Sequence, residues 1–277
     1  MQSTKCCVPV RSGSTFEIRG HQISPERVMY SPYELVCSSK PLAYDGAALS
    51  ADLVITGTEH ARGRIVDLLG VPPERVEVVH HRIDHRIFSP QAQSGMTRSR
   101  CLRASSCIPP TGGRTRTHER LVEALAVVAD RELQLVLTGQ DYGRLGALRQ
   151  RAEELGVRAR LQHLGHVTAQ ALASLYRRAQ ALVFPSLYEG FGAPPLEAMA
   201  CGCPVACSDG ALLPEVCGDA ALPFDPRSVE SIAGARVSGD AGLREQLRRA
   251  RLDRAQSFTW RASPSGTGAI YARVAAT

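Results

Sequence analysis

Short apolar runs alternate with amphipathic segments through the second half of the chain, and this alternation constrains the fold more than any other feature. The apolar runs have the length of buried strands, and the segments between them carry apolar residues at helical spacing. Such an alternation predicts a parallel sheet covered by helices on both faces, which is an α/β fold. The predicted strands are 133–139, 160–165, 181–186 and 203–208, and the predicted helices are 119–129, 145–156, 168–180 and 195–201.

A second, smaller region with the same alternation lies nearer the N-terminus. Residues 51–57 and 75–80 are predicted strands, and residues 58–70 between them are a predicted helix. Thr58 is a suitable N-cap for this helix and Gly70 a suitable C-cap. The sequence therefore predicts one βαβ unit here.

Residues 91–118 separate the two regions and are rich in Ser, Thr, Gly, Pro and Arg, which is typical of a linker. Residues 1–45 show little periodicity and predict no particular element. We therefore expect a partial α/β domain at 1–90, a linker at 91–118 and a second domain at 119–277.

The charge of the chain favours small phosphate-bearing ligands over nucleic acid. Lys plus Arg is 33 and Asp plus Glu is 27, which gives +6, but the arginines are scattered and no basic helix is interleaved with aromatic residues. No apolar run approaches the ~20 residues that span a bilayer, and the first 20 residues lack the apolar core of a signal peptide. We therefore expect a cytoplasmic protein that does not bind nucleic acid.

The nine cysteines do not predict a metal site or a disulfide framework. Cys201, Cys203, Cys207 and Cys217 follow the spacing C-x-C-x3-C-x9-C, which lacks the C-x2-C pairs of zinc sites. We expect them to be small, buried, reduced thiols. His80, His81 and His85 are expected in a loop rather than around a metal ion.

The segment FPSLYEGFGAPPLEAMACGCPVACSD, residues 184–209, carries the strongest candidate site. Gly190 and Gly192 follow a predicted strand and allow the backbone to approach a ligand, and the start of the next helix favours a phosphate. Glu197 is expected in the first turn of that helix, where its carboxylate could accept hydrogen bonds from a ribose. The alternative is that Glu197 only complements the helix dipole and that the glycines only make a turn.

Two glutamates in this segment, Glu189 and Glu197, are separated by seven residues, and with their surroundings they carry a family resemblance. Residues 185–226 resemble the donor-site signature, E-x7-E, of the retaining GT-B glycosyltransferases of family 4. LQLVLTG, HLGHV, LYRRAQALVFPS and FTW occur in the order of that family, and residues 51–88 resemble the last βαβ unit of its acceptor domain.

The resemblance implies a GT-B fold with a Rossmann-like donor domain at 119–277 and a metal-independent transfer of a hexose, with retention, from a nucleotide-sugar to an acceptor hydroxyl. Glu197 would bind the ribose, and Glu189 would act at the donor sugar. Backbone at Gly190, Phe191, Gly192 and Gly139 would contact the donor. The resemblance of residues 213–226, LPEVCGDAALPFDP, favours GDP-mannose as the donor, and a UDP-linked sugar is the alternative. No cofactor beyond the donor substrate is implied.

The chain departs from the family pattern in three places. Arg116 stands where the family has a catalytic lysine and would keep the positive charge, with His118 beside it as a further candidate for phosphate. Arg82 replaces a glycine. The N-terminal region is shorter than a full acceptor domain, so we expect it to be truncated or divergent and the chain to bind a donor better than it transfers sugar.

Two functions are therefore open. The first is a hexosyltransferase acting on a glycan or lipid acceptor, the latter with peripheral membrane contact. The second is a non-catalytic relic that binds a nucleotide-sugar. The sequence leaves the acceptor and the oligomeric state open.

Overall fold

The computed structural model describes residues 16–18, 21–23, 28–30, 48–90, 101–105, 117–141, 143–187, 189, 191–210, 212–235 and 241–258. The chain divides into two compact units. The N-terminal unit comprises Met1–Arg82, Glu189–Phe191 and Phe258–Thr277, and the C-terminal unit comprises Ile83–Tyr188 and Gly192–Ser257. A segment of three residues from the middle of the sequence, Glu189–Phe191, is thus part of the N-terminal unit.

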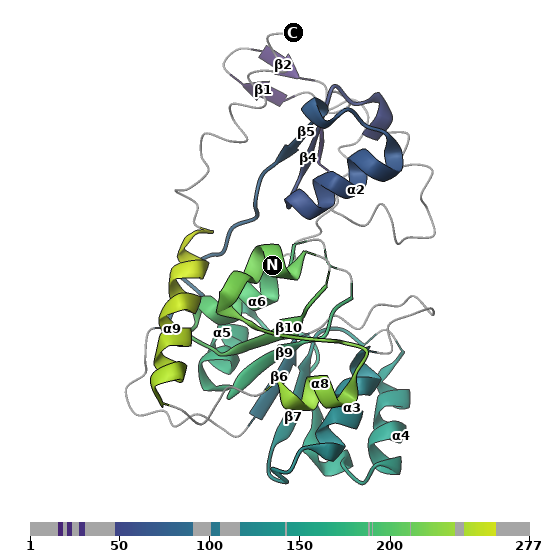
Figure 1. The fold of residues 1–277 in the computed structure, drawn as a ribbon, viewed down its shortest axis with the longest axis vertical. Coiled ribbons are helices and arrows are strands. Elements are labelled where there is room, and N and C mark those ends of the chain that lie inside the picture. The colour runs from purple at the N-terminus through teal and green to yellow at the C-terminus, as the bar shows by residue number, and fades with distance from the viewer. Residues whose placement is uncertain are drawn as a thin grey trace. The chain divides into compact units, whose positions relative to one another are not determined.

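The N-terminal unit contains a three-stranded parallel sheet in the order β3-β4-β5. Helix α2 connects β4 to β5 (Figure 1). A separate antiparallel pair is formed by β1 and β2. The bounds are β1 (Phe16–Ile18), β2 (His21–Ile23), β3 (Val28–Tyr30), β4 (Leu53–Thr56), α2 (Glu59–Leu69), the 3-10 helix η2 (Pro73–Arg75) and β5 (Val76–Val78). The predicted βαβ unit is therefore confirmed.

Both ends of α2 form as its sequence predicts. Thr58 has extended backbone angles, and its Oγ1 accepts a hydrogen bond of 3.1 Å from the Ala61 N–H. At the other end Gly70 adopts the left-handed region, with φ 67°, and donates its N–H to the Val66 carbonyl. Between the caps, Ile65 packs with Val54, Val71 and Val76 in a small core.

The C-terminal unit is built on a six-stranded sheet in the order β11-β10-β9-β6-β7-β8, and all its pairings are parallel. Its strands are β6 (Cys101–Ser105), β7 (Gln134–Thr138), β8 (Leu161–His163), β9 (Ala181–Phe184), β10 (Val205–Ser208) and β11 (Leu222–Phe224). Numbered from β6, this is the order 3-2-1-4-5-6 of Rossmann-like folds.

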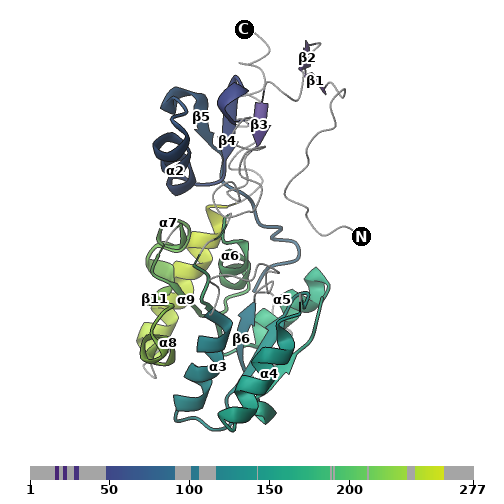
Figure 2. The ribbon, with the colours of Figure 1, turned by 90° about the vertical axis from the view of Figure 1, so that its right-hand side faces the viewer.

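Helices cover both faces of this sheet (Figure 2). Helix α3 packs with α4 and α8, and α6 packs with α5 and α9. The helices are α3 (Thr117–Val127), α4 (Leu145–Glu154), the 3-10 helix η3 (Arg158–Arg160), α5 (Ala169–Arg178), α6 (Ala193–Ala200), α7 (Leu213–Cys217), the 3-10 helix η4 (Gly218–Ala220), α8 (Val229–Gly234) and α9 (Ala241–Gln256). The predicted α/β layering is confirmed.

The prediction of a linker at 91–118 is wrong for Cys101–Ser105, which form strand β6. This strand lies between β7 and β9, so it pairs on both sides. Its sequence, CLRAS, contains a central arginine and no apolar run, and the pairing with two neighbours determines the strand. Helix α3 also begins inside the expected linker, at Thr117.

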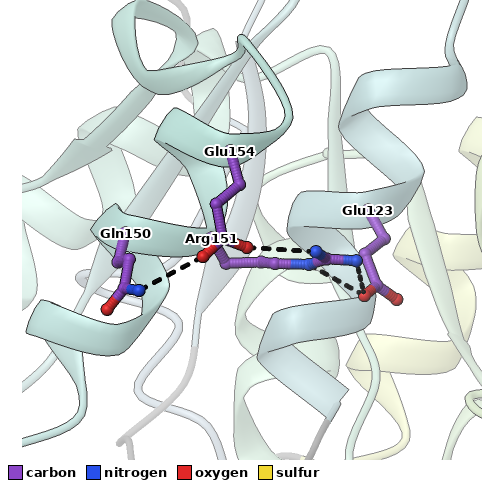
Figure 3. Close-up of polar contacts among 4 residues, drawn as sticks. All are labelled: Glu123, Gln150, Arg151 and Glu154. Atoms are coloured by element: carbon purple, nitrogen blue, oxygen red, sulfur yellow. Dashed lines mark hydrogen bonds and ion pairs between the residues drawn. The ribbon is translucent and has the colours of Figure 1, made fainter.

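An ion-pair network joins α3 to α4 on the outside of the C-terminal unit (Figure 3). The Arg151 guanidinium lies 2.8 Å from Glu123 of α3 and 3.1 Å from Glu154 of its own helix. Gln150 donates to the other carboxylate oxygen of Glu154 at 3.2 Å. Because these side chains are partly exposed, each pair contributes at most about 1 kcal/mol to stability.

No helix in the described part of the chain is both long enough and apolar enough to cross a membrane.

Candidate functional site

The order of the strands locates the candidate site in the C-terminal unit. Strands β6 and β9 are neighbours in the sheet, although two other strands separate them in the sequence. The chain leaves β6 and β9 towards opposite sides, and open α/β sheets bind ligands outside the carboxyl ends of such a strand pair. The segments that follow these two strands lead into α3 and α6.

Helix α6 begins at a glycine that no other residue could replace without strain. Gly192 is the N-cap and has φ 82°, in the left-handed region. A Cβ atom on it would lie 3.0 Å from Leu213 Cδ2. Pro194 and Pro195 occupy the first turn and have no N–H. At the start of α6, the N–H groups of Gly192 and Ala193 are therefore the backbone donors that have no acceptor within the helix.

Glu197 lies in the second turn of α6, so the prediction of a first-turn position is wrong. Gly192 turns the chain directly into the helix, which makes Ala193 the first helical residue and Glu197 the fifth. The dipole of a helix acts mainly within the first turn. The alternative that Glu197 only complements the helix dipole is therefore weakened, because this half-buried residue lies beyond the first turn.

Gly139 follows β7 and is fixed on both sides by hydrogen bonds. Its N–H donates to the Gly165 carbonyl at 2.9 Å, and its own carbonyl lies 3.0 Å from His163 Nε2. Since a carbonyl can only accept, the imidazole donates this bond. With φ 123° the residue also has a conformation that favours glycine. Its backbone is thus held rigidly at the carboxyl edge of the sheet.

Two other predicted residues, Glu189 and Phe191, belong to the N-terminal unit. Glu189 is half-buried and Phe191 is buried. The Phe191 ring packs against His80, His81 and Phe258, so a ligand would meet the backbone of this residue. Gly190 and Arg116 lie outside the described residues.

His118, the second residue of α3, is a feature whose character the sequence did not reveal. Its side chain is 7% exposed, and burial, aided by the charge of Arg144, lowers its pKa to about 4. Arg144 itself pairs with Glu119 at 3.3 Å. His118 is therefore neutral at pH 7 and brings no positive charge to a phosphate, contrary to the role considered from the sequence.

The thiols and histidines of the described residues form no metal site. Among these residues, no three His, Cys, Asp or Glu side chains are placed so that they could share an ion. Cys201, Cys203, Cys207 and Cys217 are buried thiols, as predicted.

The order of the strands and the glycine start of α6 define a Rossmann-like unit, and comparison with solved structures agrees with this fold. This chain is similar to the crystal structure of Anabaena HepE in complex with UDP and glucose, with a TM-score of 0.72 and 19% identity. The match covers 84% of this chain and 67% of the HepE chain. This match confirms the predicted fold class, an α/β fold with Rossmann-like parallel sheets and helices.

Residues 112–248 match the family model of glycosyl transferases group 1. The predicted GT-B glycosyltransferase family is thereby confirmed.

Two curated relatives agree with this assignment. The chain is 44% identical over 102 residues to an O-antigen chain mannosyltransferase B of Escherichia coli, which is 36% of this chain and 27% of the relative. It is 31% identical over 234 residues to an MMP alpha-(1->4)-mannosyltransferase of Mycolicibacterium hassiacum, which is 80% of this chain and 55% of that protein. The chain thus spans about half the length of the second relative and less of the first.

Proposed function

We propose that this protein binds a nucleotide-sugar in its C-terminal unit and transfers the hexose to an acceptor hydroxyl. The observation that carries the proposal is the start of α6, where Gly192 leaves backbone N–H groups open at the ligand edge of the sheet and Glu197 follows one turn later. This helix lies within the residues that match the group 1 glycosyltransferases.

Each proposed contact has a chemical reason. The N–H groups of Gly192 and Ala193 would bind the diphosphate, because they carry the positive end of the helix dipole. Glu197 would accept hydrogen bonds from the ribose diol, as acidic residues do in related folds. The fixed backbone of Gly139 would line the same edge. Backbone donors placed in this way stabilise the charge that develops on the leaving diphosphate.

Three further assignments rest on the family resemblance. Glu189 would face the donor sugar, supported by Gly190 and Phe191, and Arg116 would supply positive charge to the diphosphate. His118 cannot supply that charge because it is neutral at pH 7. Retention of configuration and independence of metal ions belong to the same proposal.

The donor is proposed to be linked to UDP or GDP. The name of the solved HepE complex includes UDP and glucose, whereas both relatives described above are named mannosyltransferases. These names favour a hexose and lean towards mannose. The acceptor is proposed to be a glycan or lipid hydroxyl.

Calorimetric titration of the purified chain with UDP and GDP tests the proposal. Removal of a hydrogen-bonding partner with a charge costs about 1.5–3 kcal/mol, so Glu197→Ala should weaken binding of the preferred nucleotide by about ten- to a hundredfold. Glu189→Ala is the matched control, since a residue that meets only the sugar should leave this affinity unchanged. A chelator should change neither value.

A folded Glu197→Ala variant with the wild-type dissociation constant would contradict the assignment of the ribose. Binding of both nucleotides too weak to detect in the wild type would overturn the proposed function itself. Turnover of UDP- or GDP-linked hexoses then distinguishes a transferase from a protein that only binds the donor.

A further inference from the structure

The Phe191 side chain is enclosed by residues from three separate parts of the sequence, all within the N-terminal unit. Its ring centroid lies 4.9 Å from that of His81, 6.2 Å from that of His80 and 5.7 Å from that of Phe258, the last in an edge-on arrangement. Only 6% of the side chain is exposed. Aromatic pairs at these separations attract one another beyond the effect of burial alone.

The two histidines reach this position because they follow strand β5 directly. His80 is itself fixed, since its Nδ1 lies 2.9 Å from the Gly57 carbonyl at the end of the neighbouring strand β4. Burial, and to a lesser extent the charge of His80, lower the pKa of His81. His81 is therefore neutral at pH 7 and packs on Phe191 as an aromatic ring.

Gly57 shows how little space remains around this contact. A Cβ atom at this position would lie 3.1 Å from His81 Cδ2 and 3.5 Å from Phe191 Cδ2. The first distance is shorter than side chains normally allow, so His81 would have to move. The glycine, the imidazole and the phenyl ring are thus packed as one group.

Glu189 lies two residues before Phe191 in the same segment of the N-terminal unit. We propose that His81 is a positioning residue, which packs on Phe191 and thereby holds the Glu189 carboxylate for the donor sugar. The inference rests on the proposed function, because it assigns Glu189 to the sugar. It adds a residue outside the E-x7-E segment, and it predicts an effect on the sugar that is separate from binding of the nucleotide.

The first experiment examines the contact in the free protein, so it does not depend on any activity. With isotope-labelled histidine, the imidazole signal of His81 is identified by its loss in His81→Phe. A phenyl ring at 4.9 Å shifts that signal, so Phe191→Leu should move it. If the His81 signal does not move in Phe191→Leu, the proposed contact between His81 and Phe191 is overturned.

The second experiment measures two affinities for each variant, one for UDP-glucose or GDP-mannose and one for the corresponding nucleoside diphosphate. His81→Ala and Phe191→Ala should lower the affinity for the nucleotide-sugar by about tenfold, since a charged hydrogen bond is lost. The affinity of His81→Ala for the diphosphate should remain that of the wild type. His81→Phe keeps a ring at this position and should restore the affinity for the sugar.

A matched glycine pair completes the design. Gly57→Ala pushes on His81 and should reproduce the loss, whereas Gly63→Ala in α2 of the same unit, where a Cβ meets nothing within 4 Å, should not. Equal losses for both ligands would indicate general damage and overturn the positioning role, as would unchanged affinities. The proposed function fails separately, if the wild type binds neither nucleotide.

Discussion

Helices α2 and α6 both follow a parallel strand through a segment that contains glycine, but their first turns are completed in different ways. At α2 the Thr58 hydroxyl accepts a backbone N–H, and Glu59 places a negative charge in the first turn. At α6 the cap is Gly192, which has no side chain, and the first turn Ala-Pro-Pro has no acidic residue. The start of α2 is capped by side chains of its own sequence, whereas the start of α6 has no side-chain cap and no acidic residue to complement its positive dipole end.

Other helices of the C-terminal unit resemble α2 in this respect. Thr168 and Ser228 cap α5 and α8 with their hydroxyl groups. At the start of α4, Asp141 Oδ1 accepts from the N–H groups of Gly143, Arg144 and Leu145. These side-chain acceptors contrast with the glycine start of α6. The five-residue helix α7 also begins without a side-chain cap, at Leu212, but it has Glu215 in its first turn.

The largest effect is expected at a third helix start, that of α3, where a neutral imidazole is buried. The pKa of His118 falls from 6.5 to about 4 on folding, so the unfolded chain binds more protons between these values. The free energy of unfolding should therefore fall as the pH is lowered through this window, by about 3 kcal/mol in total. Urea unfolding between pH 7 and pH 4 measures this slope.

His118→Gln should reduce the slope, because the variant has no proton to take up at this position. His166→Gln is the control, since the side chain of His166 is exposed and keeps its contact with water. If the free energy of unfolding changes with pH equally in wild type and His118→Gln, the buried His118 does not cause the expected loss of stability.

The next effect concerns the glycine that distinguishes α6 from α2. Gly192→Ala combines a left-handed backbone with a contact of 3.0 Å to Leu213, and should lower the free energy of unfolding by about 2 kcal/mol or more. Gly143→Ala has a similar φ of 88° but meets nothing within 4 Å, so it should cost only the backbone strain of about 1 kcal/mol. Equal losses in thermal or urea unfolding would mean that the close packing at Gly192 has no energetic weight.

The smallest effect is expected for the side-chain cap itself. Thr58→Ala should lower the free energy of unfolding by about 1 kcal/mol, because the Ala61 N–H loses its acceptor. Thr168→Ala removes the equivalent bond at α5, at an exposed site where water can replace it, and should cost less. Neither variant should change the affinity for a nucleotide, and a change in Thr58→Ala would contradict a purely structural role for this start.

The sequence could predict those parts of the fold that are determined locally. Both caps of α2 follow from Thr58 and Gly70, because each residue acts on the helix end beside it. Strand β6 could not be predicted, since it is stabilised by pairing with β7 and β9 and not by its own apolar content. The same limit applies to Glu197, whose turn depends on where Gly192 begins the helix.

The candidate site likewise has features that the sequence could predict and features that it could not. The spacing of Glu189 and Glu197 marked the segment, which lies within the residues that match the family model. The enclosure of Phe191 by His80, His81 and Phe258 was not predictable, because these residues meet only when distant segments come together. The pKa of His118 was equally hidden, since it depends on burial under neighbouring elements.

The reactivity of the buried cysteines can be used to measure how often the C-terminal unit opens. Cys201 and Cys203 lie between α6 and β10, Cys207 lies in β10 and Cys217 ends α7. None of the four is more than 4% exposed. A hydrogen bond with Cys207 and burial raise the pKa of Cys217, so its reactive thiolate is scarce at pH 7. Alkylating reagents can therefore modify these four thiols only when the surrounding elements separate. A ligand bound at the start of α6 would slow their labelling, and mass spectrometry of the labelled chain would record its binding without any assay of sugar transfer.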